Sequence, residues 1–191
     1  MKITEMKLDG VLLLEPEVYG DERGFFLETF RQEELREAGL EVEFVQHNHS
    51  RSRRGVLRGM HYQLEQAQGK LVRCVRGEIY DVAVDIRRNS AHFGDWVGLR
   101  LDDVGHRQIY VPPGLAHGFL VLSEVADVEY KCTDYYHPAS EAGIAWDDEA
   151  VGIEWPLAEV GGEVVVSDKD RQHPVLREQD RVPVYQKRLV T

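Results

Sequence analysis

The chain has 191 residues, of which 42% are hydrophobic, enough to bury a substantial core, and we expect one domain over residues 1–191. Its net charge of −11 argues against binding to nucleic acid, which requires a basic face to displace the counterions of the phosphates. Residues 1–5 carry no apolar signal region and no run approaches the ~18 apolar residues of a membrane span, so we expect a cytoplasmic protein without a membrane partner.

Short runs of alternating apolar and polar residues dominate the chain and predict strands, because successive side chains of a strand point to opposite faces. The predicted strands cover residues 11–14, 43–48, 56–62, 71–76, 79–86, 96–101, 108–111, 119–122 and 128–136. Gly77 and Glu78 fit a turn between two of these strands. So many short strands, separated by Gly, Pro, Asn and Asp, predict an all-β sandwich or barrel.

Two segments depart from this pattern. Residues 31–40 predict a short surface helix, because most of its faces are charged and Gly39 is a typical helix-ending residue. The chain beyond residue 175 has no strong pattern, although the apolar residues among 182–185 are candidates for a last strand or a docking segment.

Two motifs are typical of the double-stranded β-helix barrels called cupins. The first, G-x5-H-x-H-x3,4-E-x6-G, is matched at its opening and close by Gly55, His61 and Gly77. The second, P-x-G-x2-H-x3-N, is matched by Pro112, Gly114 and His117. We therefore expect an all-β, cupin-like double-stranded β-helix (jelly-roll) barrel with a short helix in its N-terminal half and a few C-terminal turns.

The metal-binding half of the cupin motifs is broken. The positions of the second His, the Glu and the Asn are taken by Gln63, by Ala67 or Gln68, and by Val121. A catalytic metal usually needs at least three His or carboxylate ligands, and only two histidines remain. Cys74 and Cys132 form no CxxC pair, so we expect reduced, partly buried thiols. The sequence therefore predicts no metal.

His61 and His117 have two readings. An isolated histidine in a barrel is usually a core residue whose ring nitrogens are satisfied by hydrogen bonds. Here other polar side chains also occupy strand positions, where pointing inward is costly unless they are paired or functional; they are Arg58, Lys70, Asp81 and Tyr130. A neutral His is a base near physiological pH, Tyr is a weak acid, and Lys or Arg stabilises a developing enolate. This set favours proton transfer on a carbonyl compound.

Nine further segments of the sequence narrow the interpretation as a proton-transfer protein to one protein family. They are residues 20–26, 44–46, 48–50, 55–63, 68–73, 81–85, 112–120, 130–133 and 152–156. Taken together, from roughly residue 8 to 171, the chain resembles the dTDP-4-dehydrorhamnose 3,5-epimerase family. The resemblance implies an isomerase that uses no metal or cofactor. Its reaction would invert C3 and C5 of dTDP-4-dehydro-6-deoxy-D-glucose and give dTDP-4-dehydro-L-rhamnose for dTDP-rhamnose biosynthesis.

The resemblance also implies roles for individual residues. His61 removes the carbon-bound proton, and Asp170 orients and supports its imidazole. Tyr130 returns a proton from the opposite face. Lys70 stabilises the enolate, with help from His117. Together these roles describe an inversion in which one wall of the site removes a proton and the other wall delivers one.

Substrate contacts follow from the same resemblance. The implied positions are Arg23, Phe26, Glu28, Gln46, Asn48, Arg58, His117, Tyr136, Glu141 and Lys169. Arginine suits a diphosphate because its planar fork of donors matches the phosphate oxygens, and an aromatic ring offers a stacking surface for thymine. The resemblance further implies a homodimer in which residues of one subunit reach the site of the other.

Three alternatives stay open at the level of sequence. Relatives with nearly the same residues epimerise C3 alone or C5 alone, and the sequence does not separate these outcomes. A metal-dependent cupin would require the missing ligands. A noncatalytic module that binds a sugar nucleotide would keep Arg58 and Lys70 but would not need His61 and Tyr130.

Overall fold

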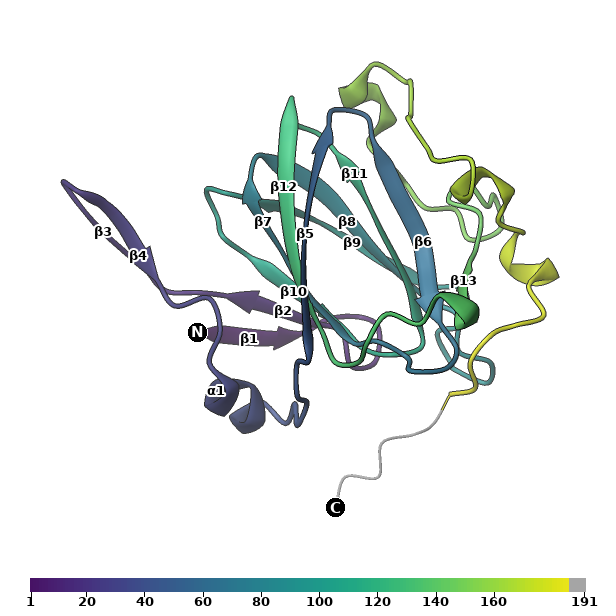
Figure 1. Cartoon of the computed structure of the whole chain (residues 1–191), viewed down its shortest axis with the longest axis horizontal. Coiled ribbons are helices and arrows are strands. Elements are labelled where there is room, and N and C mark those ends of the chain that lie inside the picture. The colour runs from purple at the N-terminus through teal and green to yellow at the C-terminus, as the bar shows by residue number, and fades with distance from the viewer. Residues whose placement is uncertain (186–191) are drawn as a thin grey trace.

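Two β-sheets that face one another make up most of the computed structural model, which describes residues 1–185 (Figure 1). The first sheet has six strands, in the order β1 (Lys2–Glu5), β2 (Leu12–Glu15), β10 (Gln108–Val111), β7 (Lys70–Arg76), β12 (Val125–Cys132) and β5 (Gln46–Arg53). The second has five, in the order β13 (Glu141–Gly143), β6 (Leu57–Gln63), β11 (Leu115–Val121), β8 (Glu78–Asp85) and β9 (Trp96–Asp102). The predicted all-β, cupin-like architecture is confirmed, with two sheets that do not close into one.

The main core lies between the two sheets. Residues two apart on a strand point to the same face, so the alternating patterns seen in the sequence direct every second side chain inward. The six-stranded sheet contributes Val72 and Ile109, and the five-stranded sheet contributes Ala83 and Phe119, all of them buried. Burial of these apolar faces holds the sheets together.

Each sheet also has a covered outer face. The helix α1 (Gln32–Glu37) packs Leu35 beside Leu12 and Leu14 of the six-stranded sheet. The outer face of the five-stranded sheet is covered by the C-terminal third of the chain, which runs along one side in Figure 1. That region contains four short 3-10 turns, η1 (Pro138–Ser140), η2 (Leu157–Val160), η3 (Asp170–Gln172) and η4 (Leu176–Glu178).

The predicted boundaries of four elements were wrong by three or more residues. Strand β11 covers Leu115–Val121 rather than residues 119–122, and β12 covers Val125–Cys132 rather than residues 128–136. The helix and β5 differ as well. The helix covers six residues rather than residues 31–40, because the chain turns at residues 38–39. Strand β5 begins at Gln46 rather than at residue 43, and Phe44 instead packs with the cluster beneath the helix. In both cases tertiary packing overrides the local pattern.

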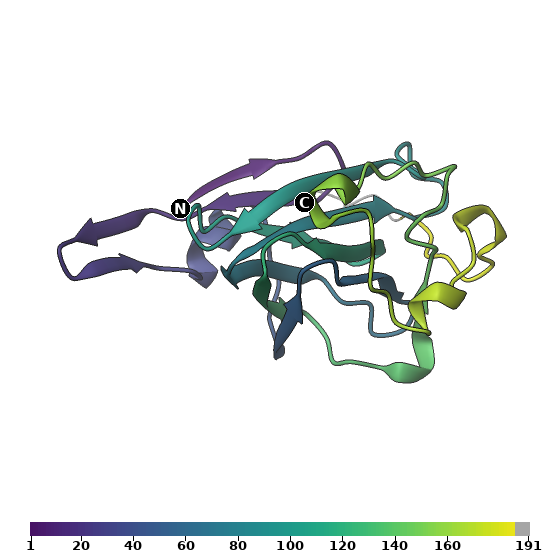
Figure 2. The same ribbon diagram turned by 90° about the horizontal axis from the view of Figure 1, so that it is seen from above.

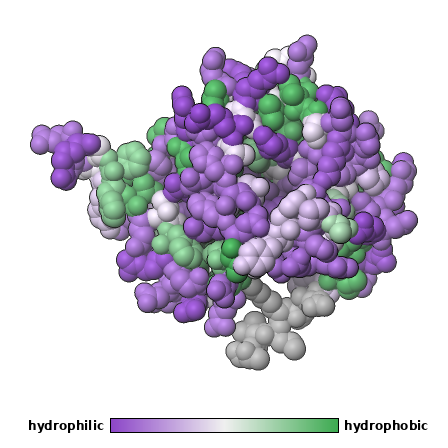
Figure 3. Space-filling model, in the orientation of Figure 1, coloured by the Kyte–Doolittle hydropathy of each residue, from purple (hydrophilic) through white to green (hydrophobic). Residues whose placement is uncertain are grey.

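A two-stranded hairpin extends away from the body of the protein (Figures 1 and 2). It consists of β3 (Val18–Asp21) and β4 (Gly24–Leu27). The sequence analysis missed these strands, as well as β1 and β13. Strands β1, β3 and β4 are exposed along most of their length and show no clear alternation of apolar and polar residues, and β13 has only three residues. Hydrophobic side chains on this hairpin lie next to its hydrophilic tip (Figure 3).

The residues near the end of the described chain dock onto the body, as predicted. Val184 forms a parallel bridge with Arg88, and the Tyr185 N–H donates to the Arg88 carbonyl over 2.9 Å. The Tyr185 hydroxyl donates to Asp9 over 2.8 Å.

Both Cys74 and Cys132 are free and buried. Within residues 1–185, no helix has the length and apolar character that crossing a bilayer requires.

The turn predicted at Gly77 carries the chain from one sheet to the other, because β7 and β8 lie in different sheets. Gly77 has φ +79°, in the left-handed region. A Cβ at this position would lie 2.2 Å from the Val125 carbonyl oxygen, which belongs to backbone and cannot swing away. This turn therefore requires glycine for two independent reasons.

We predict that Gly77→Ala lowers the free energy of unfolding by about 1–3 kcal/mol more than Gly161→Ala does. Gly161 is a matched control, because its φ is +80° but nothing lies within 4 Å of a Cβ there. Urea unfolding followed by circular dichroism measures both losses. Equal losses would show that the contact with Val125 has no cost.

Candidate active site

A pocket of about 290 Å³ lies between the two sheets. Seven of the residues predicted to act in catalysis or substrate binding line it, namely Gln46, Asn48, His61, Lys70, Tyr130, Tyr136 and Glu141. Tyr62, Gln63 and Gln68 complete its lining. The fold thus gathers residues from distant parts of the chain into one polar pocket.

The six-stranded sheet forms one wall of the pocket. In its register Tyr130 lies opposite Asn48, while Cys132 lies between Gln46 on one side and Lys70 on the other. These residues share the inner face because they are spaced by two along their strands. The face is apolar along the start of β12 and becomes polar at Tyr130, where the pocket begins.

The five-stranded sheet forms the opposite wall. His61 on β6 is paired in register with His117 on β11, and Glu141 on β13 is paired with Gln63. His61 and Tyr130 therefore enter the same pocket from opposing sheets. This is the arrangement that inversion at a carbon atom requires.

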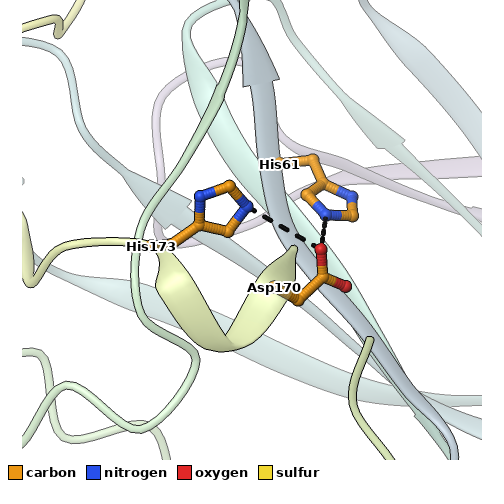
Figure 4. Close-up of side chains that lie close together, drawn as sticks. All are labelled: His61, Asp170 and His173. Carbon is orange, nitrogen blue, oxygen red and sulfur yellow. Dashed lines mark hydrogen bonds and ion pairs between the residues drawn. The ribbon is translucent and has the colours of Figure 1, made fainter. Parts of the chain in front are cut away.

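Asp170 holds the His61 ring, although 109 positions separate them in the chain (Figure 4). His61 Nε2 lies 2.7 Å from Asp170 Oδ1, and Asp170 Oδ2 accepts from the Gly59 N–H over 3.3 Å. Burial acts to raise the pKa of Asp170, but the hydrogen bonds from His61, Gly59 and Ser167 lower it below its ordinary value. An ionised carboxylate only accepts, so the proton resides on Nε2 and the His61 lone pair is on Nδ1.

His173 belongs to the same cluster, and the sequence analysis missed it. Its Nε2 lies 3.7 Å from Asp170 Oδ1, and its ring meets the His61 ring edge-on with centroids 5.8 Å apart (Figure 4). A Cβ on Gly143 would lie 2.4 Å from His173 Nε2, so only glycine leaves room for this ring. The one cue in the sequence is its spacing of three from Asp170, which places Asp170 at the start of η3 and His173 directly after its end.

The surroundings shift the pKa values of Lys70 and Tyr130 in opposite directions. Withdrawal from water lowers the pKa of the Lys70 ammonium, although Cys132, Asp81 and Glu141 act in the opposite direction. Burial raises the pKa of the Tyr130 hydroxyl, which therefore stays protonated at neutral pH. A protonated phenol on this wall of the pocket can donate a proton to a molecule bound there.

His117 forms a second histidine–carboxylate pair. Its Nε2–H donates to Asp81 over 2.9 Å, and both side chains are buried. His117 and Lys70 together line a small space beside the main pocket. His117 is thus a core histidine whose ring is satisfied by a hydrogen bond, which is one of the two interpretations that the sequence allowed. It also lies next to Lys70.

Hydrogen bonds fix the mouth of the pocket. Glu141 accepts from the Tyr136 hydroxyl over 2.6 Å and from Lys169. Burial acts to raise the pKa of Glu141, but Lys169 and Tyr136 lower it below its ordinary value. Gln46 accepts from the Tyr136 N–H over 2.9 Å and donates to Asn48 over 3.1 Å.

Six predicted substrate contacts lie outside this lining: His117 and Lys169, whose partners are given above, and four others. Arg58 is exposed, donates to Ser52 over 3.0 Å and lies near enough to Tyr130 to act on its pKa. Arg23, Phe26 and Glu28 lie on or beside the β3–β4 hairpin and do not reach the pocket of their own chain (Figure 1). Arg23 pairs with Asp21, Glu28 pairs with Arg31, and Phe26 is 70% exposed.

The positions that would carry metal ligands in a cupin are otherwise engaged. The Gln63 amide donates to the Gln66 and Tyr135 carbonyls and accepts from the His137 N–H. Gln68 donates to the Asp134 carbonyl over 2.8 Å, and Val121 offers no ligand atom. These residues do not fit the metal site of that motif.

The family model for dTDP-4-dehydrorhamnose 3,5-epimerase matches residues 5–178. The chain belongs to this family. It is 54% identical to the dTDP-4-dehydrorhamnose 3,5-epimerase of Methanothermobacter thermautotrophicus, over 96% of this chain and 97% of the relative. Membership in this epimerase family identifies the protein as an isomerase.

Solved structures of the epimerase family have the same fold. The enzyme RmlC from Legionella pneumophila, in complex with dTDP-4-keto-L-rhamnose, superposes with a TM-score of 0.92 at 49% identity, over 97% of this chain and 98% of that one. ChmJ from Streptomyces bikiniensis, a 3′-monoepimerase in complex with dTDP-quinovose, superposes with a TM-score of 0.88 at 35% identity, over 95% and 92%.

We predict that Asp170→Asn lowers the free energy of unfolding by about 1–3 kcal/mol at pH 7, because charged hydrogen bonds to His61 and Gly59 are weakened. The folded-state pKa of Asp170 is depressed, so its stabilisation is present above the unfolded pKa of ~3.9 and is lost as the pH falls through the folded pKa. Urea unfolding at pH 7 and at about pH 3 measures this. A gap between the two proteins that does not shrink at low pH would contradict the assignment.

Proposed function

We propose that this protein epimerises C3 and C5 of dTDP-4-dehydro-6-deoxy-D-glucose and thereby forms dTDP-4-dehydro-L-rhamnose for dTDP-rhamnose biosynthesis. The observation that carries the proposal is the placement of His61 and Tyr130 on opposing walls of one pocket. Both carbons flank the C4 ketone, which acidifies their protons. A base on one face and an acid on the other are what inversion next to a ketone requires.

His61 is the proposed base. Its Nε2–H is engaged by Asp170, so Nδ1 carries the lone pair that accepts the carbon-bound proton. The imidazolium that forms is stabilised by the adjacent Asp170 carboxylate. Tyr130, kept protonated by burial, then delivers a proton to the opposite face of the ring.

Lys70 is the proposed partner of the enolate oxygen. A carbon acid beside a ketone is far weaker than imidazolium, so the oxyanion needs electrostatic stabilisation, and a well-placed donor is worth about 3–4 kcal/mol. Lys70 lines the same pocket as the proposed base and acid, and it is paired in register with Cys132. His117 adjoins it and supports the same region.

The other contacts are proposed to hold the nucleotide sugar. Arg58 is suited to the diphosphate, and Lys169, paired with Glu141, contributes further charge at the pocket mouth. Gln46 and Asn48 offer amides to thymine or sugar hydroxyls, and Tyr136 offers a ring for stacking. We also propose that the reaction needs no metal or cofactor, supported by the engagement of Gln63 and Gln68 with backbone groups.

A single-centre epimerase is the alternative. ChmJ, described as a 3′-monoepimerase, shares the fold at 35% identity, so the fold alone does not choose between one centre and two. Which carbons react depends on whether the sugar ring can present both C3 and C5 to His61 within the same pocket.

The test is proton NMR of dTDP-4-dehydro-6-deoxy-D-glucose with the protein in D2O, with and without a chelator. We expect the C3 and C5 proton signals both to be lost, and the rate of loss at each carbon to be the same with the chelator as without it. Exchange at one carbon alone would establish the single-centre alternative, and a rate that depends on the chelator would contradict the metal-free mechanism.

His61→Ala is the control for this experiment. Without the base, exchange is expected to fall to the background level, while affinity for dTDP stays within a few fold, because the nucleotide contacts remain. A His61→Ala protein that retains substantial exchange would remove His61 from the mechanism.

We further propose a cytoplasmic homodimer in which the β3–β4 hairpin of one subunit completes the site of the other. The hairpin projects from the body and carries exposed apolar residues, including Tyr19, Phe25 and Phe26 (Figure 3). Exposed apolar surface of this kind favours an interface. Arg23 and Glu28 would then meet substrate in the partner's pocket.

Mixing two inactive variants tests this proposal. Arg23→Ala removes a hairpin contact and His61→Ala removes the base. If hairpins act across the interface, a mixed dimer contains one site that has both His61 and Arg23, so activity returns to about a quarter of the wild-type level after statistical exchange of subunits. Recovery of no activity from exchanged subunits would contradict the crossing hairpin.

A further inference from the structure

Three ligand-type side chains meet at one point in this protein. Among residues 1–185, His61, Asp170 and His173 form the one set of His, Cys, Asp and Glu whose ligand atoms all lie within 4.8 Å of one another (Figure 4). His61 occupies the first His position of the cupin motif, but Asp170 and His173 lie outside that motif, whose other ligand positions are not filled by His or carboxylate residues. The cluster therefore raises a separate question of metal binding.

His173 is the informative member of this cluster. Its Nε2 is buried, and no hydrogen-bond partner for it is found within the described part of the chain. The side chain is only 12% exposed, so leaving this nitrogen unpaired has a cost. It faces the same Asp170 oxygen that His61 uses, and Gly143 leaves the room that allows it to do so.

We propose that His61, Asp170 and His173 form an inhibitory binding site for Zn²⁺. Two imidazoles and one carboxylate are a ligand set that zinc prefers, and three protein ligands leave one position of a tetrahedral ion for water. The ligand atoms of such a site lie roughly 3.3 Å apart. The distances from Asp170 Oδ1 to His61 Nε2 and His173 Nε2 are 2.7 and 3.7 Å, so each differs from this spacing by about half an ångström, and all three ligand atoms lie within 4.8 Å of one another.

The surroundings of Asp170 suit a residue that binds zinc. The second carboxylate oxygen of Asp170, Oδ2, accepts a hydrogen bond from the Gly59 N–H. The backbone N–H of Asp170 donates to Ser167 Oγ over 3.1 Å. These two bonds fix the orientation of the carboxylate. The His61 side chain is 28% exposed and lines the pocket, which gives an ion a route in from solvent.

Inhibition follows from the proposed function, on which this part of the inference rests. Zinc binds the Nε2 lone pair of a neutral imidazole, so the ring proton that now lies between His61 Nε2 and Asp170 moves to Nδ1. Nδ1 then carries a proton in place of its lone pair, so His61 no longer accepts the carbon-bound proton. Mg²⁺ prefers oxygen ligands and is expected not to inhibit.

The test measures zinc affinity by competition with a chromophoric chelator, without substrate. We expect one zinc per chain in the wild type, and binding at least about tenfold weaker in both His173→Ala and His173→Gln. The glutamine variant keeps a polar side chain in case the alanine variant folds poorly. His49→Ala is the matched control, because His49 also lies beside two carboxylates, Asp127 and Glu129, and its loss should leave zinc affinity unchanged.

Wild-type affinity in both His173 variants, or no zinc binding by the wild type, would overturn the site. Inhibition is measured separately, relative to the zinc-free activity of each protein, and should follow the binding curve and be reversed by EDTA. Zinc binding without inhibition would overturn the inhibitory role. Because the binding measurement needs no substrate, a failure of the proposed epimerase reaction would not be mistaken for a failure of the zinc site.

Discussion

The hydrogen bond between His61 and Asp170 is the interaction on which the proposed chemistry depends. It joins strand β6 of the five-stranded sheet to the C-terminal segment that covers the outer face of that sheet. Because Asp170 is ionised and only accepts, the bond fixes the tautomer of His61 and directs the lone pair of Nδ1 away from the carboxylate. A residue far along the chain thus sets the protonation of the proposed base.

The two-sheet architecture supplies the other constraint. The space between the sheets is filled with apolar side chains along most of its length and turns polar where Tyr130, Lys70 and His61 enter it. Burial there keeps the tyrosine protonated and lowers the pKa of the lysine. The same withdrawal from water that stabilises the core therefore prepares an acid on one wall, opposite the base on the other.

Much of this could be predicted from sequence, for a physical reason. Strands with period two indicate which side chains share a face, so Tyr130 and Lys70 could be recognised as polar residues at strand positions of a barrel, whereas Asn48 was suggested only by the resemblance. The contact between His61 and Asp170 could not be predicted in this way, because such a pattern says nothing about contacts over 109 positions, and only the resemblance suggested it. His173 gave little signal, since the room for its ring depends on Gly143, which lies on a strand far from it in the chain.

The central claim is that removal and delivery of the proton are separate tasks of His61 and Tyr130. Tyr130→Phe incubated with dTDP-4-dehydro-6-deoxy-D-glucose in D2O tests it most directly, with NMR following both exchange and configuration. We predict that deuterium still enters at the carbon beside the ketone while inversion is lost, because the base can return a deuteron only to the face it took it from. Inversion at the wild-type rate would contradict the assignment of Tyr130, and so would loss of exchange together with inversion.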